Sequence, residues 1–176
     1  GKMKYKRAAI WISAVLYIAM GVIVISILLT ATIPVINKLK DKNTFIETKR
    51  LLYVIDNNIR TVAKEGPGSQ RDLSPFVLNK GQLYIHQNDT IVWRMETTAE
   101  LLEPDININE GVLNLYLEKT PVVGKYSVQA LINYNSVYEL NLTSPYKQPY
   151  AGRYSVLIKH SGNYIQNRPV IEISIS

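Results

Sequence analysis

The sequence contains no cysteine, which excludes a disulfide framework, a cysteine-based zinc site and a cysteine nucleophile. It has only two histidines, so a histidine-based metal site is not expected either. It also lacks a P-loop, a Gly-x-Ser-x-Gly elbow, a His-Glu-x-x-His pair and a dinucleotide-binding fingerprint. These absences predict a protein that is not an enzyme and that has no cofactor or metal.

The few residues that could carry chemistry lack suitable partners. His86 lies in an alternating run without a serine or aspartate at a recognised spacing, and His160 lies beside a turn, so both are expected to be structural or surface residues. Residues 105–110 offer the alternating oxygen ligands that begin a calcium loop. An EF-hand needs glycine at its sixth position and glutamate at its twelfth, where this chain has Glu110 and Tyr116. A plain loop leading into a strand is therefore the expectation.

What the chain does have is one long apolar run, AAIWISAVLYIAMGVIVISILLTATIPVI, from Ala8 to Ile36, without a charged residue. A run of this kind is typical of a membrane-spanning helix. At ~1.5 Å per residue its ~29 residues extend ~43 Å, more than the ~30 Å hydrocarbon core of a bilayer. The helix must therefore tilt, extend past the bilayer, or be covered by something other than lipid.

The net charge of +6 does not indicate a nucleic-acid partner, because much of the excess flanks the apolar run. The cations before the run have no acidic neighbour, whereas those after it are mixed with Asp41 and Glu47. The positive-inside rule therefore places the N-terminus in the cytoplasm and the rest of the chain outside. The flanking cations are Lys2, Lys4, Lys6, Arg7, Lys38, Lys40 and Lys42.

Beyond Pro34, where a helix kink is expected, the pattern changes from wholly apolar to amphipathic. Apolar residues then recur at intervals of seven, three, four and three, which places them on one helix face that packs on a following domain. Gly66-Pro67-Gly68-Ser69 ends the helix. The predicted helix covers 9–65, apolar to 36, with a hinge over 66–72. The residues expected to pack the stalk on the head are Phe45, Leu52, Ile55, Ile59 and Val62.

Residues 73–176 consist of short runs rich in Val, Ile, Leu and Tyr, separated by turns, and no helical pattern interrupts them. This pattern predicts an antiparallel β-sandwich head of immunoglobulin-like size, and an α+β fold for the whole chain. The expected strands are 82–86, 90–95, 112–117, 126–134, 137–142, 154–159 and 170–175.

Two surface features are expected on this head. Asn88-Asp-Thr90 and Asn141-Leu-Thr143 match the N-glycosylation pattern. Tyrosine is abundant, with twelve in the chain, mainly as strand residues that pack on the sheet. An alternative is that Tyr146 and Tyr150 form an exposed contact surface.

The beginning of the chain resembles the class III signal of archaeal type IV pilins and archaellins. The shared features are a basic segment over 1–8, the junction Lys6-Arg7-Ala8 and the long apolar helix that follows. The resemblance implies a prepilin peptidase that recognises Lys6, Arg7 and Ala8 and leaves Ala9 as the first mature residue. GPGSQR after the helix is similar to archaeal pilin-like proteins as well. The glutamate that bacterial pilins carry near the start of the mature helix is missing, which points away from the bacterial branch.

The resemblance implies a subunit of an extracellular filament of the type IV pilus or archaellum kind, serving motility, adhesion or cell contact. Its partners would be further copies of itself, the membrane before assembly, the export and assembly machinery and the peptidase. Before assembly the helix would lie in the cytoplasmic membrane with the head outside. The alternative is a single-pass membrane anchor that presents a β-sandwich binding module. Residues expected to form the filament core are Ile10, Trp11, Ile12, Val15, Leu16, Ile18, Met20, Val22, Ile23, Ile25, Leu28 and Leu29.

Overall fold

The computed structural model describes residues 2–176, with side chains described from Trp11 onward. The chain divides into two compact units, Gly1–Lys40 and Asp41–Ser176. We call residues 11–36 of the first unit the apolar segment, and Asp41–Ser176 the globular unit. The globular unit therefore includes the last part of the long helix as well as all the strands.

A single helix, α1 (Lys2–Glu65), accounts for the helical residues of both units, and Pro34 lies inside it. The helix ends where Gly66 takes a positive φ of 92°, a left-handed conformation that glycine adopts without steric cost. The Gly66 amide bonds the carbonyl of Val62 at 3.2 Å, and the Ser69 hydroxyl donates to that carbonyl at 2.8 Å. The carbonyl of Val62, in the last helical turn, is thus satisfied as the chain leaves for the sheet.

Eight strands follow and are joined in one mostly antiparallel sheet, of order β3-β4-β5-β2-β1-β7-β8-β6. Only the pair β6 and β8 is parallel. The strands are β1 (Gln70–His86), β2 (Thr90–Thr97), β3 (Asn107–Glu110), β4 (Leu113–Lys119), β5 (Tyr126–Asn133), β6 (Glu139–Thr143), β7 (Tyr150–Ile165) and β8 (Arg168–Ile175).

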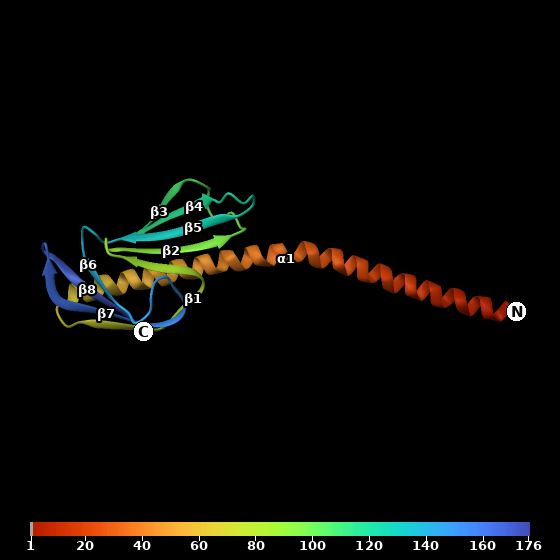
Figure 1. Ribbon diagram of the computed structural model, residues 1–176, viewed down its shortest axis with the longest axis horizontal. Helices are drawn as coiled ribbons and strands as arrows, with labels where there is room; N and C mark the ends of the chain where they lie inside the picture. The colour runs from red at the N-terminus through yellow and green to blue at the C-terminus, as the bar shows by residue number, and fades with distance from the viewer. Residues whose placement is uncertain (1) are drawn as a thin grey trace. The chain divides into compact units, whose positions relative to one another are not determined.

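Strand β1 bends sharply, and the bend folds the sheet around the helix. Its pairing with β7 shifts register between Leu78 and Leu83. At Gly81, where φ is 88°, an added Cβ would lie 2.5 Å from Nε1 of Trp93, so only glycine fits this corner. Within the globular unit, β2 to β5 lie on one side of α1, and the first part of β1 lies with β7 on the other (Figure 1).

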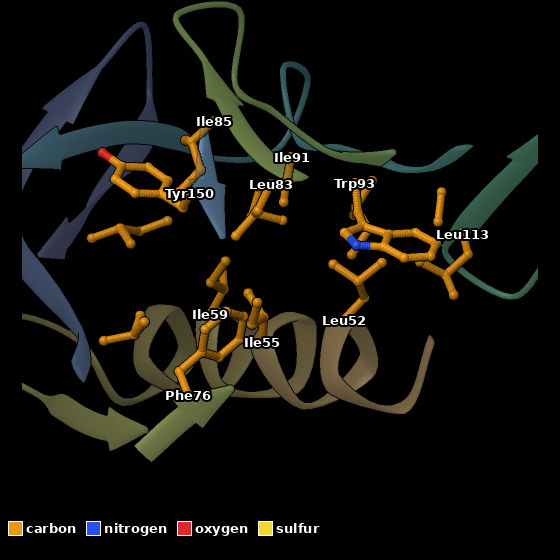
Figure 2. Packing of buried hydrophobic residues seen from close by; sticks show 14 of the residues in the cluster. Leu52, Ile55, Ile59, Phe76, Leu83, Ile85, Ile91, Trp93, Leu113 and Tyr150 are labelled. Atoms are coloured by element: carbon orange, nitrogen blue, oxygen red, sulfur yellow. The ribbon is translucent and has the colours of Figure 1, made fainter. Parts of the chain in front are cut away.

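The core of the globular unit is one cluster to which both the helix and the sheet contribute. Leu52, Ile55 and Ile59 point from α1 toward the strands (Figure 2), and each is at most 4% exposed. The amphipathic stripe of the helix thus supplies the apolar surface on which the sheet packs. The strand residues that meet it include Phe76, Leu83, Ile91, Trp93 and Leu113.

The α+β class predicted from the sequence agrees with this architecture, but an immunoglobulin-like sandwich is not confirmed. Hydrogen bonds join all eight strands into a single sheet, and helix residues fill its concave side. Each predicted run overlaps a strand, whereas β3 and the first part of β1 were not predicted. Residues 70–80 carry Pro75 and a run of turn-forming residues, and β3 is polar, so neither shows the alternation of a half-buried strand.

Candidate functional site

The apolar segment is the most unusual surface of the molecule. Each of its large apolar side chains is between 44% (Ile36) and 77% (Tyr17) exposed, on every side of the helix. Large exposed apolar surfaces on proteins mark contacts with other proteins or with lipid. The side chains of Lys6, Arg7, Ala8, Ala9 and Ile10 lie outside the described residues. The other residues expected in a filament core all lie on this exposed surface.

Hydroxyl groups within the apolar segment are bonded to the helix itself. Ser26 donates to the carbonyl of Val22 at 2.8 Å, Thr30 to Ser26 at 2.8 Å, and Thr32 to Leu28 at 2.7 Å. Side chains bonded in this way bring little unsatisfied polarity into apolar surroundings. The segment is also the one stretch of the described chain that is long and apolar enough to cross a membrane, by length and composition alone.

Pro34 lies near the end of this segment, inside α1. Proline has no backbone N–H, so the carbonyl one turn earlier, that of Thr30, loses its usual helical donor. The kink expected there from the sequence stays a prediction. The five residues expected to pack the stalk on the head, from Phe45 to Val62, are each at most 4% exposed and belong to the core cluster.

Charged residues of the globular unit form structural networks. Asp56 is 7% exposed and accepts hydrogen bonds from Nε of Arg60 and from the hydroxyl of Tyr134, each at 2.9 Å. Burial, and then the neighbouring Asp56 carboxylate, raise the pKa of Tyr134 far above its usual value. The hydrogen bond to Asp56 raises the pKa of Arg60. The network holds the helix to Tyr134, the residue that follows β5.

A second buried carboxylate anchors the beginning of the globular unit. Asp41 accepts hydrogen bonds from Nζ of Lys80 at 2.7 Å and from the Thr97 hydroxyl at 2.8 Å. Asp89 does the same at the other end of β2, where it accepts from the Leu140 amide at 2.7 Å and from Arg168 at 3.1 Å. Each carboxylate binds segments that are distant in the sequence, so both stabilise the fold.

The two histidines and the acidic loop that begins at Asp105 lie apart from one another and contact other kinds of residue. No group of metal-ligating side chains occurs among the described residues. His160 is fully buried, and its Nδ1 accepts a hydrogen bond from the Gly162 amide at 3.0 Å, while His86 stacks on Tyr84. In the rejected calcium loop, Asp105 lies near Lys119 at 3.8 Å and the residues after it enter β3.

The two glycosylation patterns differ in accessibility. Asn141 and Thr143 are both exposed on β6, which is an edge strand. Asn88 is exposed in a turn, but Thr90 is 5% exposed and its hydroxyl bonds the Asn88 carbonyl at 3.3 Å. Asn141 is therefore the more accessible of the two candidate acceptors.

The tyrosines near the beginning of β7 differ in exposure, and one of them is in the core while another is on the surface. Tyr146 is 53% exposed, whereas Tyr150 is 1% exposed in the core, so the two do not form one exposed surface. Both pack edge to face on Tyr154, at 5.7 and 5.6 Å between ring centroids.

Two surface features were missed from the sequence. The first is a hollow of about 630 Å³ between α1 and the first part of β1. Its only sequence signal is Val54, an apolar residue on the polar face of the helix. The second is the turn Pro121–Gly124, in which Val123 is 99% exposed. The signal that could have revealed this turn is the pair of adjacent valines between a proline and a glycine.

Comparisons of the chain with protein-family models, with curated proteins and with solved structures each find no match.

Proposed function

We propose that this protein is a structural subunit of an extracellular filament of the type IV pilus kind, which polymerises through its apolar helix. In the assembled filament the apolar segments of many copies bundle into a core, and the globular units cover the outside. We also propose that the globular unit is immunoglobulin-like. In this proposal the two sides of its one bent sheet take the place of the two separate sheets of a sandwich. Before assembly the helix lies in the cytoplasmic membrane, with the globular unit outside.

One observation carries the proposal: every large apolar side chain of residues 11–36 is at least 44% exposed. Each buried aliphatic side chain contributes ~1.5–3 kcal/mol, so this surface is unfavourable in water and must be covered. Identical helices can cover it along its full ~39 Å, whereas a bilayer covers ~30 Å. The length of the run therefore favours a filament core.

The alternative is a single-pass anchor that presents the globular unit as a binding module. Exposure on every side of the helix favours it equally, because lipid surrounds a lone helix completely. The two functions differ in where the mature chain is found. A filament subunit leaves the membrane, and an anchored module does not.

The test is to shear appendages from cells that make the full chain, and to examine them by electron microscopy and mass spectrometry. We expect filaments that contain this chain, with Ala9 as the first residue. A matched variant, Arg7→Gln, should block removal of residues 1–8 and leave the chain in the membrane fraction, because the junction loses a cation. Recovery of the unmodified chain only as a detergent-solubilised monomer would contradict the filament and favour the anchor.

A further inference from the structure

The hollow between α1 and the first part of β1 is an apolar groove with charged edges. Leu51 and Val54 line it from the helix, and Leu73, Pro75 and Val77 line it from β1. Val54 lies on the outward face of the helix and is 47% exposed, although its side chain is apolar. Apolar hollows of this size on a protein surface are typical of binding sites.

The edge of the groove carries two carboxylates without a cationic partner. Glu47 accepts a hydrogen bond from the Asn79 amide at 3.0 Å, and Asp72 accepts one from the Ser74 hydroxyl. Neither carboxylate belongs to an ion pair in the described part of the chain, nor does Arg50, which lines the same groove. The groove therefore suits an apolar ligand flanked mainly by cations.

The globular unit itself carries a projection of that chemistry. In the turn between β4 and β5, Val122 is 55% exposed and Val123 is 99% exposed. Lys119 and Lys125 flank the two valines, and Glu118 precedes Lys119 in the sequence. We call residues 119–125 the valine turn.

The valine turn is held in one conformation. The Lys125 amide donates to the carbonyl of Val122 at 3.1 Å, and the Thr120 amide donates to the carbonyl of Lys125 at 3.2 Å. The Thr120 hydroxyl bonds the Lys125 carbonyl as well, at 3.0 Å. A preformed turn loses little conformational entropy when it binds, so its two valines are presented for a contact.

The valine turn and the groove of one subunit cannot meet. In the sheet, β5 and β2 separate β4 from β1, and the first part of β1 lies on the other side of α1 from β4 and β5 (Figure 1). A contact between them must therefore join two copies. Because the two surfaces are different, the contact is heterologous and can repeat without closing, as a filament requires.

We propose that the valine turn of one subunit inserts Val122 and Val123 into the groove of a second copy. Lys119 and Lys125 then lie near Glu47 and Asp72, which form no ion pair with any of the described side chains of their own subunit. This inference rests on the proposed filament, and it specifies a contact between globular units in addition to the bundled helices. The contact gives each subunit a fixed neighbour on the outside of the filament.

The cysteine-free sequence permits a direct test by cross-linking in intact filaments. One chain carries Val123→Cys and the other carries Val54→Cys, and both are made in the same cells. We expect a short bismaleimide to give covalent dimers when both variants are present. Either variant alone should give none, because a heterologous contact brings unlike positions together. A chain with both cysteines should give a ladder of oligomers.

The control is Val137→Cys with Val54→Cys, because Val137 is 44% exposed in a different turn. All three valines are exposed, so none of these variants should prevent folding. Filaments in which the Val123 and Val54 pair cross-links no better than the control would overturn the docking contact and leave the filament standing. Absence of filaments from the unmodified chain would overturn both.

Discussion

Ile23 and Ile59 are the same residue type in the same helix, yet Ile23 is 59% exposed and Ile59 is 0% exposed. The difference extends to their surroundings: from Trp11 to Ile36 every large apolar side chain is exposed, whereas the stripe from Phe45 to Val62 is buried by the strands. The second part of the helix thus finds its cover within the chain. The first part needs a cover that the chain does not provide, and this requirement is the basis of the proposed assembly.

If neighbouring helices cover the apolar segment, this segment should not tolerate a bulky residue at a close contact. An added Cβ at Gly21 meets no atom within 4 Å in the subunit, so Gly21→Leu should fold normally and stay apolar enough for the membrane. Close packing between helices needs small residues, so we expect filaments to be lost while the chain remains in the membrane fraction. Electron microscopy and membrane fractionation measure the two effects.

The matched control for that variant is Ile18→Leu, which conserves volume at an exposed position of the same segment. It should leave filaments intact. Normal filaments from Gly21→Leu would contradict tight bundling of the helices at this residue.

The next largest effect separates the two parts of the helix directly. Ile59→Ala removes a fully buried side chain and should lower the free energy of unfolding of the globular unit by ~2–5 kcal/mol. Ile23→Ala removes the same atoms from an exposed site and should leave that free energy unchanged. Denaturant unfolding in detergent, followed by the fluorescence of the buried Trp93, measures both. Equal losses would show that the apolar segment also packs within its own subunit.

A smaller effect concerns the polar contact that ties the buried part of the helix to Tyr134, the residue after β5. Tyr134→Phe removes the hydroxyl that bonds Asp56, at a cost of about 1–3 kcal/mol. Tyr134 has a pKa raised above its usual ~10, so the unfolded chain loses this proton at a lower pH than the folded one. The stabilisation is complete below pH ~10 and declines as the pH rises above it.

The measurement is the free energy of unfolding as a function of pH, for the wild type and for Tyr134→Phe. The variant should lose the part of the alkaline decline that belongs to this tyrosine, whereas Tyr146→Phe, at an exposed ring, should keep it. An unchanged profile in Tyr134→Phe would refute this role of the Asp56 contact.

The smallest effect is expected at the surface of the globular unit. Nζ of Lys49 lies 2.8 and 3.0 Å from the two carboxylate oxygens of Glu110, but the Glu110 side chain is 46% exposed. An exposed ion pair contributes at most ~1 kcal/mol and weakens with salt. A double-mutant cycle with Lys49→Met and Glu110→Gln should give a coupling of that size or less. A larger coupling would mean that this edge of the helix is more strongly held than its exposure indicates.

The sequence predicted the elements with strong periodicity. The stripe from Phe45 to Val62 and the alternating runs of β4 and β8 follow from side-chain spacing alone, because burial on one face fixes that spacing. Spacing did not reveal how the strands are joined. The bend at Gly81 depends on its contact with Trp93, and the parallel pairing of β6 with β8 depends on contacts between segments far apart in the sequence.

The same division applies to the candidate surfaces. The apolar segment was recognised from the sequence, since its apolar residues are consecutive and need no contact with distant residues to form a single surface. The groove was not visible, because Leu51 and Leu73 come together only when β1 crosses the helix. Asp41 and Asp56 were also not recognised as buried, since a carboxylate is buried only where the fold supplies donors such as Lys80 and Tyr134.

The two tryptophans allow the central claim to be tested, because Trp93 is buried in the globular unit and Trp11 is 73% exposed in the apolar segment. The emission of Trp11 can be obtained as the difference between wild-type and Trp11→Phe filaments, freed of lipid and detergent. Cover by neighbouring copies predicts blue-shifted emission that is protected from acrylamide. Red-shifted emission that acrylamide quenches freely would show that Trp11 is in water, and would contradict the filament core.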